Sequence, residues 1–206
     1  MKNPSFKIIF LMCSFVVSSF VNAQSFEPLK INPTLSNECT EDDTDVFEPK
    51  TFKLSSGQVK LKTYSCMRHH QKQQRYYSVY GLEFNTKKTV YLQDKLYEAI
   101  GYVGSNANQV DTETVIFNSM AERGGDLVLV WVQDLNHVYN LKIPYMASDE
   151  GGVRFNTKNN QIYIQKVEAL PGADVKFKNK GKPIIFKKVK DKGIVFLSGD
   201  LNAFQN

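Results

Sequence analysis

The most constraining feature of this sequence is an unbroken apolar run, Leu-Val-Leu-Val-Trp-Val, between Asp126 and Gln133. The run is too short for most helices, and it lacks the alternation of a strand that has one face in water. A strand that is buried on both faces has this composition. We therefore predict such a strand over residues 126–133.

A helix is predicted just before this strand, over residues 112–123. Asp111 can cap its first free amides, Glu113 lies near its positive end, and Gly124 can terminate it. The residues at helical spacing are Val115, Ile116, Ser119, Met120 and Arg123. We expect this helix to cover one face of the strand.

After Lys50 the chain has the pattern of short strands joined by turns. Strands are predicted over residues 51–54, 58–67, 75–84, 89–92, 138–145, 153–156, 161–167, 173–178, 183–190 and 193–198. Residues 93–103 fit both a helix and an alternating strand, so we assign no element there. The predicted fold class is α+β and β-rich: an antiparallel sheet or open barrel of successive hairpins, with the 112–123 helix packed on it.

Residues 1–23 have the layout of a secretory signal peptide. Two lysines precede an apolar stretch over residues 8–20, and Val-Asn-Ala at 21–23 offers small residues for cleavage. The apolar stretch is shorter than the roughly 20 residues that span a bilayer. We therefore expect a periplasmic or secreted protein whose mature chain begins near Gln24 and has no transmembrane segment.

The three cysteines have different expected roles. Lipidation of Cys13 would require small residues before it, but Leu-Met precedes it, so we assign Cys13 to the signal peptide. Cys39 and Cys66 remain in the mature chain, and two cysteines in an oxidising compartment predict one disulfide. The alternative is a nucleophilic Cys66 served by His69 or His70, which would need a free thiol.

Charge and composition bound the possible partners. Without residues 1–23 the formal charge falls from +5 to +3, and no nucleic-acid-binding module is recognisable, so we expect no nucleic acid. Residues 24–50 contain three prolines and a run of acids, which predicts an extended acidic arm without regular elements. This run lacks the spacing of a calcium loop. Residues 51–206 are predicted to form a single β-rich globular domain.

Sequence motifs for catalysis, metals and cofactors are not found. The chain has three histidines but no H-E-x-x-H or paired-cysteine pattern, so we predict no metal and no cofactor. Asp134 and His137 could form an acid–base pair at a hairpin tip, but Asp is also an ordinary turn residue. Paired carboxylates for glycoside cleavage stay open, because only geometry can select a pair. We name no catalytic residue, and the absence of motifs favours a non-enzyme.

The C-terminal part of the chain is rich in lysine and contrasts with the acidic arm. The candidate partner-binding residues are Lys176, Lys178, Lys180, Lys182, Lys187, Lys188, Lys190 and Lys192. This asymmetry could steer an acidic partner toward the protein. Lysines also protect exposed strand edges from aggregation, and we prefer this simpler interpretation.

Together these features favour an exported, non-enzymatic binding protein, such as an inhibitor or immunity protein against an envelope-acting toxin or hydrolase. The expected partner is another exported protein, and an acidic one if the lysines take part. One alternative is an envelope hydrolase of unrecognised type, using carboxylates or His137 with Asp134. Another is a structural or accessory envelope protein that assembles through exposed strand edges.

Overall fold

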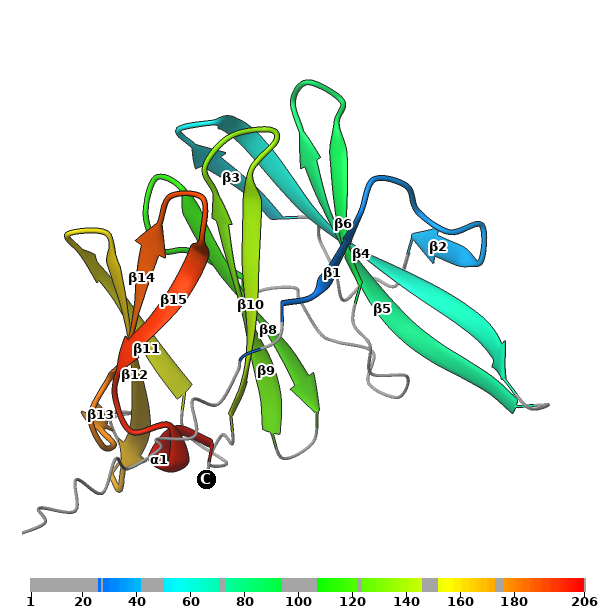
Figure 1. Ribbon diagram of the computed structural model, residues 1–206. Coiled ribbons are helices and arrows are strands. Elements are labelled where there is room, and N and C mark those ends of the chain that lie inside the picture. Colours follow the sequence, from blue (N-terminus) through cyan, green and yellow to red (C-terminus); the bar gives the residue numbers. More distant parts are fainter. Residues whose placement is uncertain are drawn as a thin grey trace, which may run out of the picture.

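The computed structural model describes residues 26, 28–41, 50–70, 73–93, 107–121, 124–145, 152–172 and 176–205. These residues form fifteen strands in three antiparallel sheets and one short helix (Figure 1). The fold is therefore essentially all-β, and the β-rich, antiparallel part of the predicted fold class is confirmed.

The first sheet has six strands and is built on a long hairpin of β4 (Gly57–His70) and β5 (Gln73–Phe84). Its other strands are β6 (Thr89–Gln93) beside β5, β1 (Lys30–Asn32) beside β6, and β2 (Cys39–Glu41) and β3 (Lys50–Leu54) beside β4. The hairpin extends past these neighbours, so residues 67–70 and 73–76 pair with each other and with no other described strand (Figure 1).

The middle sheet has four strands in the order β10-β9-β8-β7. They are β7 (Asn108–Gln109), β8 (Thr114–Ala121), β9 (Gly124–Val132) and β10 (Val138–Tyr145). Figure 1 shows this sheet between the other two. It is therefore the only one of the three sheets with a neighbouring sheet on each side.

The third sheet has five strands in the order β11-β12-β14-β15, with β13 also paired to β12. They are β11 (Gly152–Lys158), β12 (Gln161–Leu170), β13 (Lys176–Asn179), β14 (Ile184–Val189) and β15 (Gly193–Ser198). The short helix α1 (Leu201–Gln205) follows β15, and its Phe204 is buried beside this sheet. Among the described residues, no helix has the length and hydropathy needed to cross a bilayer.

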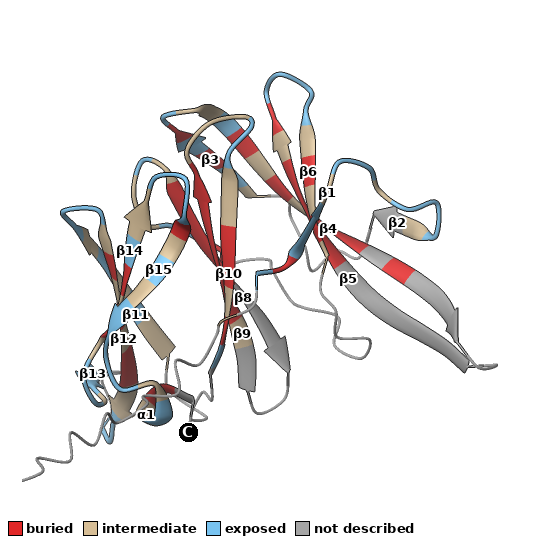
Figure 2. Cartoon of the chain, in the orientation of Figure 1, coloured by how far each residue is buried: buried red, intermediate tan, exposed pale blue. Residues whose placement is uncertain are grey.

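The middle sheet is apolar on both faces. Val128 and Val130 of β9 lie in a core shared with the first sheet, whereas Leu127 and Leu129 lie in a core shared with the third sheet. All four side chains are at most 1% exposed. Figure 2 shows buried residues along the strands of this sheet and exposed residues at its turns. The predicted strand that is buried on both faces is thus confirmed, and two sheets cover it.

The predicted helix over residues 112–123 is wrong, because this segment contains β8, which pairs with β7 and β9. β8 shares the double burial of the middle sheet: Val115 and Phe117 belong to the core with the first sheet and Ile116 to the core with the third. A strand with two apolar faces carries apolar residues at consecutive positions. Over a few residues this pattern also fits helical spacing, which explains the error.

The other predicted strands lie in hairpins of the three sheets, with shifts at their ends. The pairs β3–β4, β5–β6, β9–β10, β11–β12 and β14–β15 are all consecutive in the chain. Of the unassigned residues 93–103, only Gln93 is described, and it ends β6. Local alternation and turn residues were therefore sufficient to locate most strands.

The N-terminal segment joins all three sheets. The Phe26 ring packs against Phe186 and Phe196 of the third sheet, with ring centres 5.4 and 5.9 Å apart. The Leu29 amide then donates to Asn140 Oδ1 of the middle sheet (2.6 Å), and Asn140 Nδ2 donates back to the Leu29 carbonyl (3.2 Å). β1 continues this segment into the first sheet by pairing with β6. A short stretch of chain thus contacts every layer.

Candidate functional site

The predicted disulfide joins Cys39 of β2 to Cys66 of β4, which are directly opposite in the register with Cα atoms 4.0 Å apart. Cys66 is fully buried in a small cluster with Tyr64 and Val79, separate from the core shared with the middle sheet. The bond holds β2 on the first sheet, although β2 lies in the segment that was expected to lack regular elements. Neither thiol is free, so the nucleophilic alternative for Cys66 is wrong.

The candidate lysines do not form one patch. Lys187 is opposite Gln161 at the start of β12, whereas Lys178 is opposite Glu168 near its end. These positions are about 23 Å apart along an extended strand. The first group comprises Lys187, Lys190 and Lys192 near the β14–β15 turn, and the second comprises Lys176, Lys178, Lys180 and Lys182 around β13. Figure 1 shows β13 and this turn at opposite ends of the third sheet.

The face of the third sheet that points away from its core gathers cations and amides. Arg154 of β11 is opposite Gln165 of β12. Lys158 is opposite Gln161, which is in turn opposite Lys187 of β14. Residues directly opposite in an antiparallel pair share a face. What we call the outer face therefore consists of Arg154, Asn156, Lys158, Gln161, Tyr163, Gln165, Ile185, Lys187, Val189 and Val195.

The outer face carries positive charge that no carboxylate of the described residues neutralises. Arg154, Lys158 and Lys187 are exposed, and no described acid pairs with them. Glu168 is the one acid in the five strands, and it pairs with Lys178 (2.9 Å) beyond this face. Sequence reasoning missed Arg154 and Lys158, because strand pairing brings them beside Lys187 from another part of the chain.

An apolar groove of about 850 Å³ continues the outer face toward α1. Its lining includes the apolar residues Pro183, Ile185, Phe196 and Leu201 and the oppositely charged Lys182 and Asp200. Ile185 belongs to both the groove and the outer face. Beside them on β15, Val195 and Leu197 are 38% and 45% exposed. Cationic and apolar surfaces are therefore adjacent on this side of the third sheet.

Lys188 differs from its neighbour Lys187 because its side chain is only 7% exposed. Its Nζ lies 2.9 Å from Asp111 Oδ2, 3.0 Å from Glu113 Oε2 and 5.9 Å from the centre of the Trp131 ring. Trp131 Nε1 donates to the same Glu113 oxygen (3.1 Å). This cluster connects β14 of the third sheet to the β7–β8 turn of the middle sheet.

The protonation of Asp111 depends on this cluster. Burial alone would raise the pKa of Asp111, but hydrogen bonds from the Lys188 ammonium and the Glu113 amide outweigh it, and the pKa lies below its ordinary value. Two carboxylates neutralise the Lys188 charge, and the side chain is buried, so Lys188 is not accessible to a partner. We therefore leave Lys188 out of the proposed binding surface.

Asp134 and His137 contact each other within the β9–β10 turn. His137 Nδ1 lies 2.8 Å from Asp134 Oδ2, and both side chains are about half exposed. Asp134 Oδ1 accepts hydrogen bonds from the backbone amides of Asn136 (2.7 Å) and His137 (2.9 Å). The Asn136 amide and then the His137 ring hold the pKa of Asp134 below its ordinary value. This set of bonds is that of an Asx turn and favours the turn interpretation.

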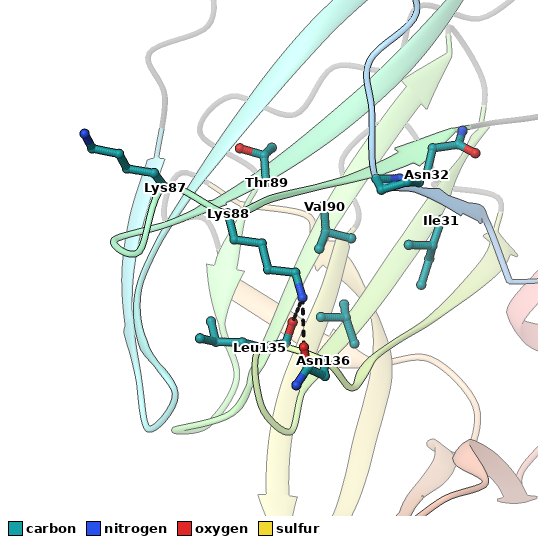
Figure 3. A pocket seen from close by; sticks show the side chains of 10 residues that line it. Ile31, Asn32, Lys87, Lys88, Thr89, Val90, Leu135 and Asn136 are labelled. Carbon is teal, nitrogen blue, oxygen red and sulfur yellow. Dashed lines mark hydrogen bonds between the residues drawn. The ribbon is translucent and has the colours of Figure 1, made fainter.

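A second cavity, of about 450 Å³, opens between the first and middle sheets (Figure 3). Its lining comes from residues 31–33, from residues 87–90 at the β5–β6 turn, and from Leu135, Asn136 and Val138 around the β9–β10 turn. The Lys88 ammonium donates to the Leu135 carbonyl and to Asn136 Oδ1 (3.1 Å). The lining contains no Asp or Glu.

Lys166 is a buried charge that sequence reasoning missed. It lies on β12, is 4% exposed, and donates to the Phe204 carbonyl of α1 (3.4 Å). Burial, and then the nearby Lys180 charge, lower the pKa of Lys166. Lys166 lies on the same inner face of the sheet as Ile162 and Ile164, so it contributes to holding α1. It is not part of the outer face.

Metal ligands do not cluster in the described part of the chain, where no three His, Cys, Asp or Glu side chains gather around one point. The side chains of His69 and His70 lie outside the described residues. Comparison with protein families, curated proteins and solved structures found no match to this chain. Its function is therefore argued from its own residues.

Proposed function

We propose that this chain is an exported binding protein without enzymatic activity, which recognises an acidic exported protein. An inhibitor or immunity protein against an envelope-acting toxin or hydrolase has this role. The N-terminal signal pattern and the Cys39–Cys66 disulfide support an oxidising compartment outside the cytoplasm.

The observation that carries this proposal is the outer face of the third sheet. Arg154 and Lys158 project from β11 and Lys187 projects from β14, on either side of β12, and the face contains no acid. Such a surface repels cationic proteins and raises the association rate of anionic ones. Its amide side chains can add hydrogen bonds to a partner's backbone or side chains.

The adjacent groove supplies a binding site for an apolar side chain, which the charged outer face alone does not. Binding energy at protein interfaces concentrates in a few apolar anchors that fill pockets, whereas rim charges mainly set the association rate. The groove beside Ile185 can accept such an anchor, and Val195 and Leu197 extend its apolar surroundings. An apolar anchor with acidic residues around it is therefore the partner surface that fits.

The test is capture of the partner from envelope and secreted extracts by the tagged protein, with mass spectrometry at low and raised salt. We expect one stoichiometric acidic protein that is lost at raised salt, because exposed charges are screened. The variant R154E/K158E/K187E should lose this partner. The matched control K30E/K53E/K87E changes three exposed lysines of the first sheet by the same total charge and should retain it.

Two results would contradict the proposal. One is a partner that the outer-face variant and its control retain equally well. The other is the absence of any acidic partner in every extract tested. The hydrolase alternative makes a different prediction, since His137→Ala would then abolish activity on wall or ester substrates while the protein stays folded.

A further inference from the structure

We propose that the cavity between the first and middle sheets binds a small molecule that joins a carboxylate to an apolar body. This site is separate from the outer face of the third sheet, and it does not depend on the proposed protein partner. The inference rests on the shape, the charge and the hydrogen bonds of the cavity lining.

The cavity has an apolar floor and a suitable size. Val90 is 6% exposed and belongs to the core between the two sheets, and Leu135 and Val138 pack against that core. Ile31 adds an apolar side chain that is 43% exposed. The volume of about 450 Å³ lies within the range of small-molecule sites.

Lys88 provides the charge that would select an anion. Figure 3 shows its side chain crossing from the β5–β6 turn toward Leu135 and Asn136, whereas Lys87 extends away from them. Both acceptors of Lys88 are neutral, and an ammonium has three hydrogens to donate. A carboxylate attracts the Lys88 ammonium more strongly than a neutral carbonyl or amide oxygen does, because it carries the opposite charge.

The two turns that supply this lining are held by their own hydrogen bonds. The Lys87 amide donates to the Phe84 carbonyl (2.9 Å), and the Phe84 amide donates to the Lys88 carbonyl (2.8 Å). The Gln133 amide donates to the His137 carbonyl (3.0 Å) in the second turn. Lys88 is therefore presented from a formed turn, so that a ligand meets an existing site and avoids the cost of ordering one.

Octanoate is a suitable probe, with octan-1-ol as the uncharged control of the same chain length. We expect saturable octanoate binding in an NMR titration of the protein, with shifts concentrated at residues 31–33, 87–90 and 135–138. Octan-1-ol should bind at least about tenfold more weakly, which is the effect of losing a hydrogen bond to a charged group.

Three variants test whether Lys88 and the cavity are responsible. Lys88→Met should weaken octanoate binding about tenfold and leave octan-1-ol unchanged, because it removes the ammonium and keeps most of the side-chain length. Lys53→Met, at an exposed lysine of β3 outside the cavity lining, is the matched control and should bind both probes like the wild type. Ile31→Trp keeps Lys88 and places a larger side chain in the cavity, on the side where Figure 3 shows Ile31, so it should weaken both probes. Thermal unfolding of each variant confirms that it is folded.

The inference is overturned if octanoate and octan-1-ol bind equally well to the wild type, or if Lys53→Met and Lys88→Met have the same effect. It is also overturned if octanoate does not saturate, or if its shifts map elsewhere on the protein. N-acetyl-leucine, a compact carboxylate, distinguishes the source of the ligand chemistry. Tighter binding of this probe indicates the end of a peptide, and tighter binding of octanoate indicates a fatty acid.

Discussion

The middle and third sheets use the same antiparallel pairing but have different surfaces. In β9 of the middle sheet, Leu129 and Val130 are consecutive and both fully buried. In β14 of the third sheet, Phe186 is fully buried and its neighbour Lys187 is exposed. Where a strand segment has a neighbouring sheet on each side, both of its faces are buried and carry apolar residues. A strand in an outer sheet of the stack has one face in contact with solvent, and in this protein that face is cationic.

The largest expected effect on stability comes from alanine substitutions at the three buried positions among these four. Leu129→Ala, Val130→Ala and Phe186→Ala should each lower the free energy of unfolding by about 2–5 kcal/mol, because each leaves a cavity in a core. Lys187→Ala should change it by less than about 0.5 kcal/mol. Urea unfolding measures all four. A neutral Leu129→Ala or Val130→Ala would show that one face of the middle sheet is not closely packed.

A medium effect on stability is expected at Lys188 of β14, a charged residue on the face of the strand that points toward the middle sheet. Lys188→Met leaves Asp111 and Glu113 without their cation, and it should lower the free energy of unfolding by about 1–3 kcal/mol. Lys187→Met, on the opposite face, is the matched control and should be neutral. Equal unfolding midpoints for the two variants would show that the Lys188 cluster does not help to hold the third sheet on the middle sheet.

The smallest effect is a pH dependence of this same contact. The pKa of Asp111 is lower in the folded protein than the unfolded value of about 3.9. Its ionised form therefore stabilises the fold above pH 3.9, and this contribution is lost as the pH falls toward and through the lower folded pKa. Urea unfolding between pH 2 and pH 7 should show a shallower acid loss for Asp111→Asn than for wild type. Asp191→Asn changes an exposed acid and should follow the wild type.

The sequence predicted the strands much better than it predicted the site. Turn residues and period-two alternation act over a few neighbours, so hairpins such as β11–β12 could be located locally. The 112–123 segment failed because its burial on two faces erased the alternation. In the lysine-rich region, the register between β12 and β14 decided that Lys187 faces water and that Lys188 faces the middle sheet.

By itself, the sequence determined the antiparallel, hairpin-rich character of this protein, its strand that is buried on both faces, and the pairing of Cys39 with Cys66. Only the tertiary structure decided how the strands divide into three stacked sheets, and which cations gather beside Lys187. It also brought Lys88 to Leu135 across two sheets. The physical reason is distance along the chain. Local preferences act between neighbouring residues, whereas a surface or a cavity is formed by segments that meet only after folding.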